Sequence, residues 1–115
     1  MRTSEMIRRA RRMGKQAACN AASWVFDGNT TDDTYRTVLK GIEDGDPAVL
    51  DAYNVPNLSG EWADGETPST LADYFGLDED NDPDGFRLDA VCAAWEEGAD
   101  TFWTEVEKLA RAHLA

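Results

Sequence analysis

The chain has 115 residues, of which 42% are hydrophobic and 30% charged, and its formal net charge is -12. This length allows one domain with a single modest core and excludes two, and four Trp, four Phe and three Tyr are too many for a disordered acidic tail. No apolar run approaches the roughly 18 residues that a membrane-spanning helix needs, so we expect no membrane span.

The order of caps, turns and apolar residues predicts an all-α fold: one compact domain, residues 1–115, of about five helices with a long C-terminal helix. The first helix is expected over about residues 4–27. Gly14 interrupts it at a cost of about 1 kcal/mol relative to Ala. Its expected buried face recurs at steps of three and four and contains Met6, Ala10, Met13, Ala17, Ala21 and Trp24.

Four further helices are expected, over about residues 31–44, 47–53, 67–76 and 86–114. Thr31, Asp46 and Thr67-Pro68 supply their starting signals, and glycine ends the second and fourth helices. The stretch 54–67 has no helical period, and we interpret it as an ordered loop held by Leu58 and Trp62.

The charge is divided unevenly along the chain. Residues 1–16 contain six basic residues and one acidic residue, a charge of +5, and the other 99 residues carry -17. We therefore expect a basic helical arm whose members are Arg8, Arg9, Arg11, Arg12 and Lys15. The arm either contacts nucleic acid or another anionic surface, or lies across the acidic body of its own or a second subunit. We favour the second interpretation, because a body of this charge repels a polyanion.

The last helix separates two faces. At about 100° per residue, its apolar arc contains Leu88, Cys92, Trp95, Ala99, Phe102, Val106 and Leu109. A separate acidic stripe contains Asp89, Glu96, Asp100 and Glu107. Glu96 and Asp100 are like charges at i, i+4, which costs a few tenths of a kcal/mol, and we expect no Lys or Arg on the stripe to relieve it. The stripe is either a solvated face or a contact surface for a cationic partner.

A contact surface of this kind can occupy the groove that a DNA-binding enzyme keeps for DNA, where Arg and Lys otherwise neutralise phosphates. Glu43 and Asp44 are expected to add to it, and other nearby carboxylates are Asp73, Asp78, Glu79 and Asp80. Trp103 lies between the stripe and the apolar arc and is the expected aromatic anchor; the alternative is a half-buried core residue. The sequence leaves the exposure of Trp62 and Trp103 open.

The loop before the last helix matches half of a calcium-binding motif. Asp80, Asp82, Asp84 and Gly85 have the spacing of the first half of an EF-hand loop, but Val91 stands where a bidentate Glu is required. We expect no metal and interpret the loop as an acidic cap of the following helix, with calcium as the weaker alternative.

The sequence gives little support to catalysis. His113 is the only histidine of the chain and is expected to be packed or terminal. Cys19 and Cys92 lack the spacing of a zinc site, and there is no Gly-rich phosphate loop, so we expect no enzyme and no cofactor. The two thiols are either core residues or a pair that forms on oxidation. The Arg-rich start lacks the apolar segment of a secretory signal, so we expect a cytoplasmic protein with reduced thiols.

Several stretches are distinctive: Asn20-Ala21-Ala22-Ser23-Trp24, Phe26-Asp27-Gly28-Asn29-Thr30, Gly41-Ile42-Glu43-Asp44-Gly45-Asp46-Pro47, Leu58-Ser59-Gly60-Glu61-Trp62-Ala63-Asp64 and Thr67-Pro68. Together with the form of the last helix, they resemble a group of uncharacterised small acidic proteins of actinobacterial phages, plasmids and mobile regions, over roughly residues 17–76. The resemblance implies a mobile-element setting, inside a bacterial host, and no mechanism. In size, acidity and helix content the chain also resembles, more loosely, the phage antirestriction proteins that imitate B-DNA, with no residue matched one by one.

These observations lead to three hypotheses. The first is a non-enzymatic inhibitor, as a monomer or a homodimer, that places its acidic face in the DNA-binding groove of a host defence enzyme. The second is an acidic adaptor or structural protein that binds a basic partner. The third is an accessory protein that binds DNA through the Arg-rich helix, which the acidic body disfavours.

Overall fold

The structure, a computed structural model, describes residues 1–28, 31–55 and 57–115, and within these ranges it is all-helical without a strand. Its helices are α1 (Thr3–Val25), α2 (Asp32–Asp44), α3 (Pro47–Tyr53), α4 (Leu71–Phe75), α5 (Phe86–Ala99) and α6 (Phe102–Leu114). The all-α prediction is confirmed. The expected C-terminal helix is also present, with an interruption at Asp100 and Thr101 that divides it into α5 and α6.

Most helix ends follow the local signals. The Asp46 carboxylate accepts a hydrogen bond from the Ala48 backbone N–H and caps α3. The prediction that Thr67-Pro68 starts the fourth helix is wrong, because Thr67 and Thr70 bond to each other instead. The Thr67 N–H donates to the Thr70 Oγ1 at 2.9 Å, and the Thr70 N–H donates to the Thr67 carbonyl, so that the helix begins only at Leu71.

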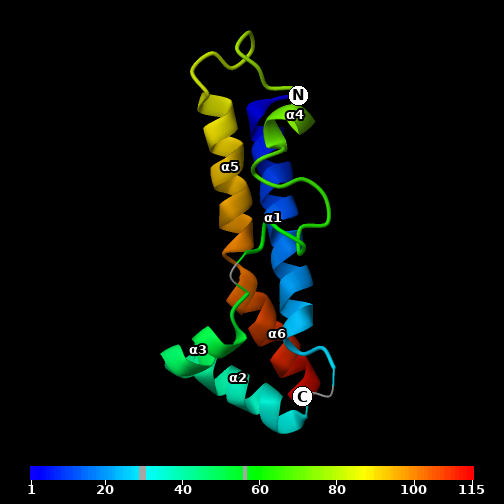
Figure 1. Cartoon of the computed structure of the whole chain (residues 1–115), viewed down its shortest axis with the longest axis vertical. Coiled ribbons are helices and arrows are strands. Elements are labelled where there is room, and N and C mark those ends of the chain that lie inside the picture. Colours follow the sequence, from blue (N-terminus) through cyan, green and yellow to red (C-terminus); the bar gives the residue numbers. More distant parts are fainter. Residues whose placement is uncertain (29–30, 56) are drawn as a thin grey trace.

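The helices form a rod with extents of 55 × 24 × 22 Å. Its radius of gyration is 16.6 Å, against about 13 Å for a spherical domain of about 100 residues. Figure 1 shows α1 running along the rod beside α5 and then α6, while α2 and α3 lie across the end that holds the C-terminus. The N-terminus and the short helix α4 lie at the opposite end (Figure 1).

The contact between α1 and α5 depends on two glycines. A Cβ atom on Gly14 would collide with the backbone carbonyl of Trp95, and a Cβ atom on Gly98 would collide with the backbone carbonyl of Arg11. The two helix backbones therefore approach as closely as the absence of side chains permits. Gly14, expected only to weaken its helix, is needed for this contact.

The core has two clusters, one in each half of the rod. The first joins the N-terminal half of α1 to α5 and includes Met6, Ala10, Ala17, Leu71, Val91 and Trp95. The second joins the C-terminal half of α1 to α2 and α6 and includes Ala18, Ala21, Ala22, Val38, Phe102 and Val106. The buried face of α1 thus turns as its partner changes from α5 to α6.

Two residues of the expected core, Trp24 and Leu109, are exposed instead. Trp24 continues the spacing of Met6 and Ala10, but it is 57% exposed because the face of α1 that packs on α6 is the one with Ala18 and Ala22. Leu109 is 39% exposed because it lies at the edge of the α6 face formed by Phe102, Val106 and Ala110. The other members of the expected α5–α6 arc are buried or half-buried.

The described residues 57–67 of the expected loop lie along the helix pair, and two hydrogen bonds hold them there. The Asn20 Nδ2 donates to the Trp62 carbonyl at 2.9 Å, and the Trp95 Nε1 donates to the Glu66 carbonyl at 3.1 Å. These bonds attach the loop to α1 and α5. In the part of the chain that the structure describes, no helix has the length and apolarity to cross a membrane.

Candidate functional site

Three carboxylates of the expected stripe, Asp89, Glu96 and Asp100, are exposed on the outer side of α5. At about 100° per residue they lie opposite Gly98, which contacts α1, and within about 40° of one another. No Lys, Arg or His in the described ranges forms an ion pair with any of them. We call these three residues the α5 acidic row.

The fourth member of the stripe behaves differently. The Arg111 guanidinium lies 2.9 Å from the Glu107 carboxylate and 2.9 Å from that of Glu43. Hydrogen bonding to Glu107 and the charges of both carboxylates raise the pKa of Arg111, against partial desolvation. The expectation that no basic residue relieves the stripe is therefore wrong at Glu107, and Glu43 and Glu107 belong to an internal ion network between α2 and α6.

Trp103 and Asp44, expected to belong to the same contact surface, lie on α6 and α2 and not beside the α5 acidic row. Trp103 is half-buried on the second core cluster, between α1, α2 and α6, with its ring centroid 4.8 Å from that of Phe102. This is the alternative that the sequence left open. Asp44 is exposed at the C-terminal end of α2. The interruption at Asp100 and Thr101 separates the α6 residues from the row, and the Thr101 hydroxyl closes the turn by donating to the Gly98 carbonyl at 2.7 Å.

The expected basic arm is helical and forms the first half of α1, packed on α5 rather than extending from the body. Arg11 pairs with Glu97 of α5 at 3.0 Å. Arg8, Arg9 and Arg12 are exposed and form no ion pair with the described residues, and Lys15 is also exposed. The favoured interpretation, that the arm neutralises the acidic body, holds for Arg11 alone.

A shallow depression lies beside these arginines. Its lining includes Arg9, Arg12, Gln16, Asp64 and the 43% exposed Tyr74. By helical position, Arg9 and Arg12 lie on the side of α1 away from Gly14 and hence away from α5. The basic and acidic surfaces are thus on opposite sides of the α1–α5 pair.

The aspartates before α5 cap that helix. The two Asp82 oxygens accept from the backbone N–H groups of Arg87 and Leu88 at 2.9 and 3.0 Å. This confirms the capping interpretation for Asp82, while Asp80 and Asp84 are exposed. No group of three or more His, Cys, Asp or Glu in the described ranges is arranged to hold a metal ion.

The two thiols are free and have different neighbours. Cys92 lies 3.6 Å from the Pro68 carbonyl, and burial, with the charges of Glu96 and Asp89, raises its pKa. Burial also raises the pKa of Cys19, and Glu105 adds to this by its charge and a hydrogen bond, against smaller opposite effects of nearby lysines.

His113 lies in the last turn of α6, near the C-terminus. It is exposed, its Nε2 lies 2.8 Å from the Asp32 Oδ1, and its ring stacks on Tyr35 with centroids 3.7 Å apart. The histidine therefore joins the C-terminal end of α6 to the start of α2.

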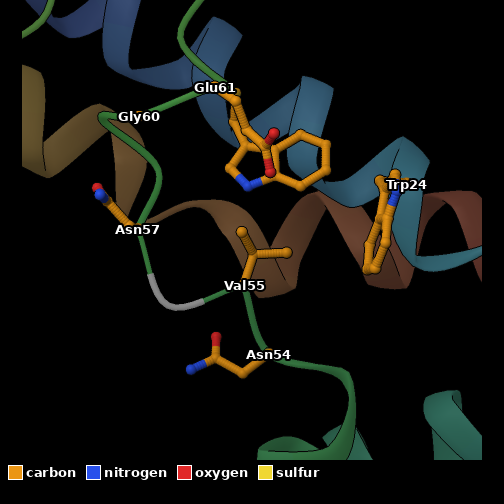
Figure 2. A pocket seen from close by; sticks show the side chains of 7 residues that line it. Trp24, Asn54, Val55, Asn57, Gly60 and Glu61 are labelled. Atoms are coloured by element: carbon orange, nitrogen blue, oxygen red, sulfur yellow. The ribbon is translucent and has the colours of Figure 1, made fainter.

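Sequence reasoning missed a pocket between the last turn of α1 and the 54–62 loop. A cavity of about 460 Å³ is lined by Trp24, Asn54, Val55, Asn57, Gly60, Glu61 and Trp62. The Trp24 and Trp62 ring centroids are 5.4 Å apart with the planes tilted by 58°. Figure 2 shows Trp24, Val55 and Glu61 around this space. Two of the distinctive stretches, 20–24 and 58–64, meet here, but the helical period had placed Trp24 in the core.

Comparison with known proteins found no matching family model, no matching curated protein and no matching solved structure. Fold and surfaces together define an elongated, all-α acidic protein with separate acidic, basic and aromatic surfaces.

Proposed function

We propose that this protein acts by binding, as an acidic mimic of duplex DNA that occupies the DNA-binding groove of a host defence enzyme. The observation that carries the proposal is the α5 acidic row, three exposed carboxylates without an ion-pair partner among the described residues, opposite the contact with α1. The resemblance to proteins of phages and mobile elements supports the setting. The rod, 24 × 22 Å across, is comparable in width to a DNA duplex.

The spacing of the row determines how such a contact would work. A helical rise of about 1.5 Å per residue places Asp89 and Glu96 about 10 Å apart along the axis, and Glu96 and Asp100 about 6 Å apart. A DNA strand carries one phosphate about every 3.4 Å, so the row alone is less dense. The 78–84 loop lies at the N-terminal end of α5 (Figure 1), and its exposed carboxylates add negative charge at that end of the row: Asp78, Glu79, Asp80 and Asp84. Binding is then fast, electrostatically steered and weakened by salt.

The test is inhibition of DNA cleavage by a panel of purified restriction and RNA-guided nucleases. We expect inhibition of at least one of them, with a half-inhibitory concentration that rises with salt. Glu96→Lys with Asp100→Lys should raise that concentration by about 100-fold or more, because the row then repels the cationic groove. Circular dichroism checks that the variant keeps its helix content.

A matched control reverses two carboxylates elsewhere, Asp33 in α2 and Asp51 in α3, both exposed. We expect this Asp33→Lys, Asp51→Lys variant to retain inhibition. An equal loss in both variants would show that only net charge matters, and undiminished inhibition by the row variant would contradict the proposal.

A role in binding nucleic acid is the second candidate, favoured by the exposed and unpaired Arg8, Arg9 and Arg12 in the described part of α1. Its test is a gel shift with duplex DNA at low salt. A shift abolished by alanine at these three positions, and retained by Arg36→Ala with Lys40→Ala, would favour this candidate over the first.

A further inference from the structure

The pocket beside Trp24 combines aromatic faces with a carboxylate. Trp62 packs on the second core cluster, and the hydrogen bond from Asn20 holds its backbone on α1, so one indole is held in place. Trp24 lies against it while remaining 57% exposed. The buried Val55 contributes to the lining, and Glu61, next in sequence to Trp62, is exposed at the same opening (Figure 2).

This combination selects a cation. The faces of indole rings are electron-rich and attract a guanidinium or ammonium group placed within about 6 Å of the ring centroid. The exposed Glu61 carboxylate at the opening attracts a cation and adds nothing to the binding of an apolar ligand. The net charge of -12 further concentrates cations near this surface.

We propose that Trp24, Trp62 and Glu61 form a receptor for one arginine side chain of a partner polypeptide. The planar guanidinium stacks on an indole face and presents its N–H groups to the carboxylate in a two-pronged arrangement that a lysine does not offer. The cavity of about 460 Å³ lies in the range of about 300–1,000 Å³ of pockets that hold small ligands, so it has room for one arginine side chain. The receptor uses no residue of the α5 acidic row and is therefore a separate binding site, independent of whether that row imitates DNA.

The experiment follows the indole N–H resonances of the whole protein by NMR during titration with N-acetyl-arginine methylamide. The citrulline analogue keeps the shape of arginine and removes its charge. We expect arginine to move the Trp24 and Trp62 resonances, assigned through Trp24→Phe and Trp62→Phe. The Trp95 resonance should stay in place, because that side chain is 3% exposed and its N–H is bound to the Glu66 carbonyl.

We expect citrulline to bind about tenfold more weakly than arginine, and Glu61→Gln to weaken arginine binding about three- to tenfold. Glu79→Gln, which removes an exposed carboxylate before α5, is the matched control and should bind as the unaltered protein does. Glu96→Lys with Asp100→Lys should also retain arginine binding, which separates this site from the proposed function.

Three outcomes would contradict the proposal of an arginine receptor. Equal binding of citrulline and arginine would make the pocket a neutral apolar site. Arginine binding unaffected by Glu61→Gln would remove the carboxylate from recognition. Movement of the Trp24 and Trp62 resonances on dilution of the protein alone would identify a second copy of the chain as the occupant.

Discussion

The outer sides of α1 and α5 differ in charge although the inner sides of the two helices are alike. Both pack through small residues around Gly14 and Gly98. Away from this contact, α1 presents Arg8, Arg9 and Arg12, and α5 presents Asp89, Glu96 and Asp100. The close glycine contact thus holds two oppositely charged surfaces back to back. A net charge of -12 does not reveal this separation, nor that each surface is suited to a partner of opposite sign.

The largest expected effect comes from breaking the contact that holds the two sides together. In Gly14→Ala the new methyl group meets the Trp95 backbone carbonyl, and no side chain can move to make room. We expect a loss of about 3 kcal/mol in the free energy of unfolding, measured by urea denaturation.

Gly41→Ala is the control for this change. The three atoms nearest to its methyl group would all belong to the Val49 side chain on the short helix α3, rather than to a backbone, so we expect a smaller loss. Equal losses in the two variants would contradict the special role of the α1–α5 contact.

A second prediction compares two carboxylates of the loop before α5: Asp82, which caps the helix, and Asp80, which is exposed. Asp82→Ala removes the acceptor of the Arg87 and Leu88 N–H groups and should cost about 1–2 kcal/mol in the free energy of unfolding. Asp80→Ala should change it by less than about 0.5 kcal/mol, because that side chain is exposed. Thermal unfolding of both variants provides the measurement, and similar values would argue against capping by Asp82.

A third prediction concerns the carboxylates that the protein neutralises itself. Arg111→Gln leaves Glu43 and Glu107 without their shared cation, and we expect only a small loss in the free energy of unfolding, because all three groups are partly exposed. Adding Glu43→Gln should restore part of it, since it removes one of the two like charges. A double-mutant cycle by urea denaturation measures the coupling, and a coupling of zero would show that the network contributes nothing.

The smallest expected effect on the free energy of unfolding comes from a change within the α5 acidic row. Glu96→Gln relieves the repulsion from Asp100 and should stabilise the protein by a few tenths of a kcal/mol. Because the charge of Glu96 adds to burial in raising the Cys92 pKa, the same change lowers that pKa.

At a pH below the Cys92 pKa the thiolate fraction therefore rises, and alkylation should become about twofold faster. The measurement uses iodoacetamide at pH 8 in a Cys19→Ser background, so that only one thiol reacts. A slower reaction in the Glu96→Gln variant would contradict the assigned influence of this carboxylate.

The helices were largely predictable because their signals are local. Asp46-Pro47 at the start of α3 and the glycines that follow α2 and α4 act within one turn of the chain. The outward direction of Asp89, Glu96 and Asp100 was also predictable, since the first two lie on α5, Asp100 directly follows its last residue, and a 3.6-residue period relates them. The same period failed at Trp24, because the partner of α1 changes from α5 to α6 and the buried face turns with it. It also failed at Leu109, which lies at the edge of the buried face of α6.

What the sequence determined by itself is the all-helical fold and a charged row on one helix, both consequences of spacing over a few residues. Only the tertiary structure decided which charges are used internally and which aromatic side chains meet. Arg111 reaches Glu43 from 68 positions away, and Asn20 holds Trp62 from 42 positions away. Such contacts depend on the packing of α1, α2 and α6, and packing is a property of several helices at once rather than of any local pattern.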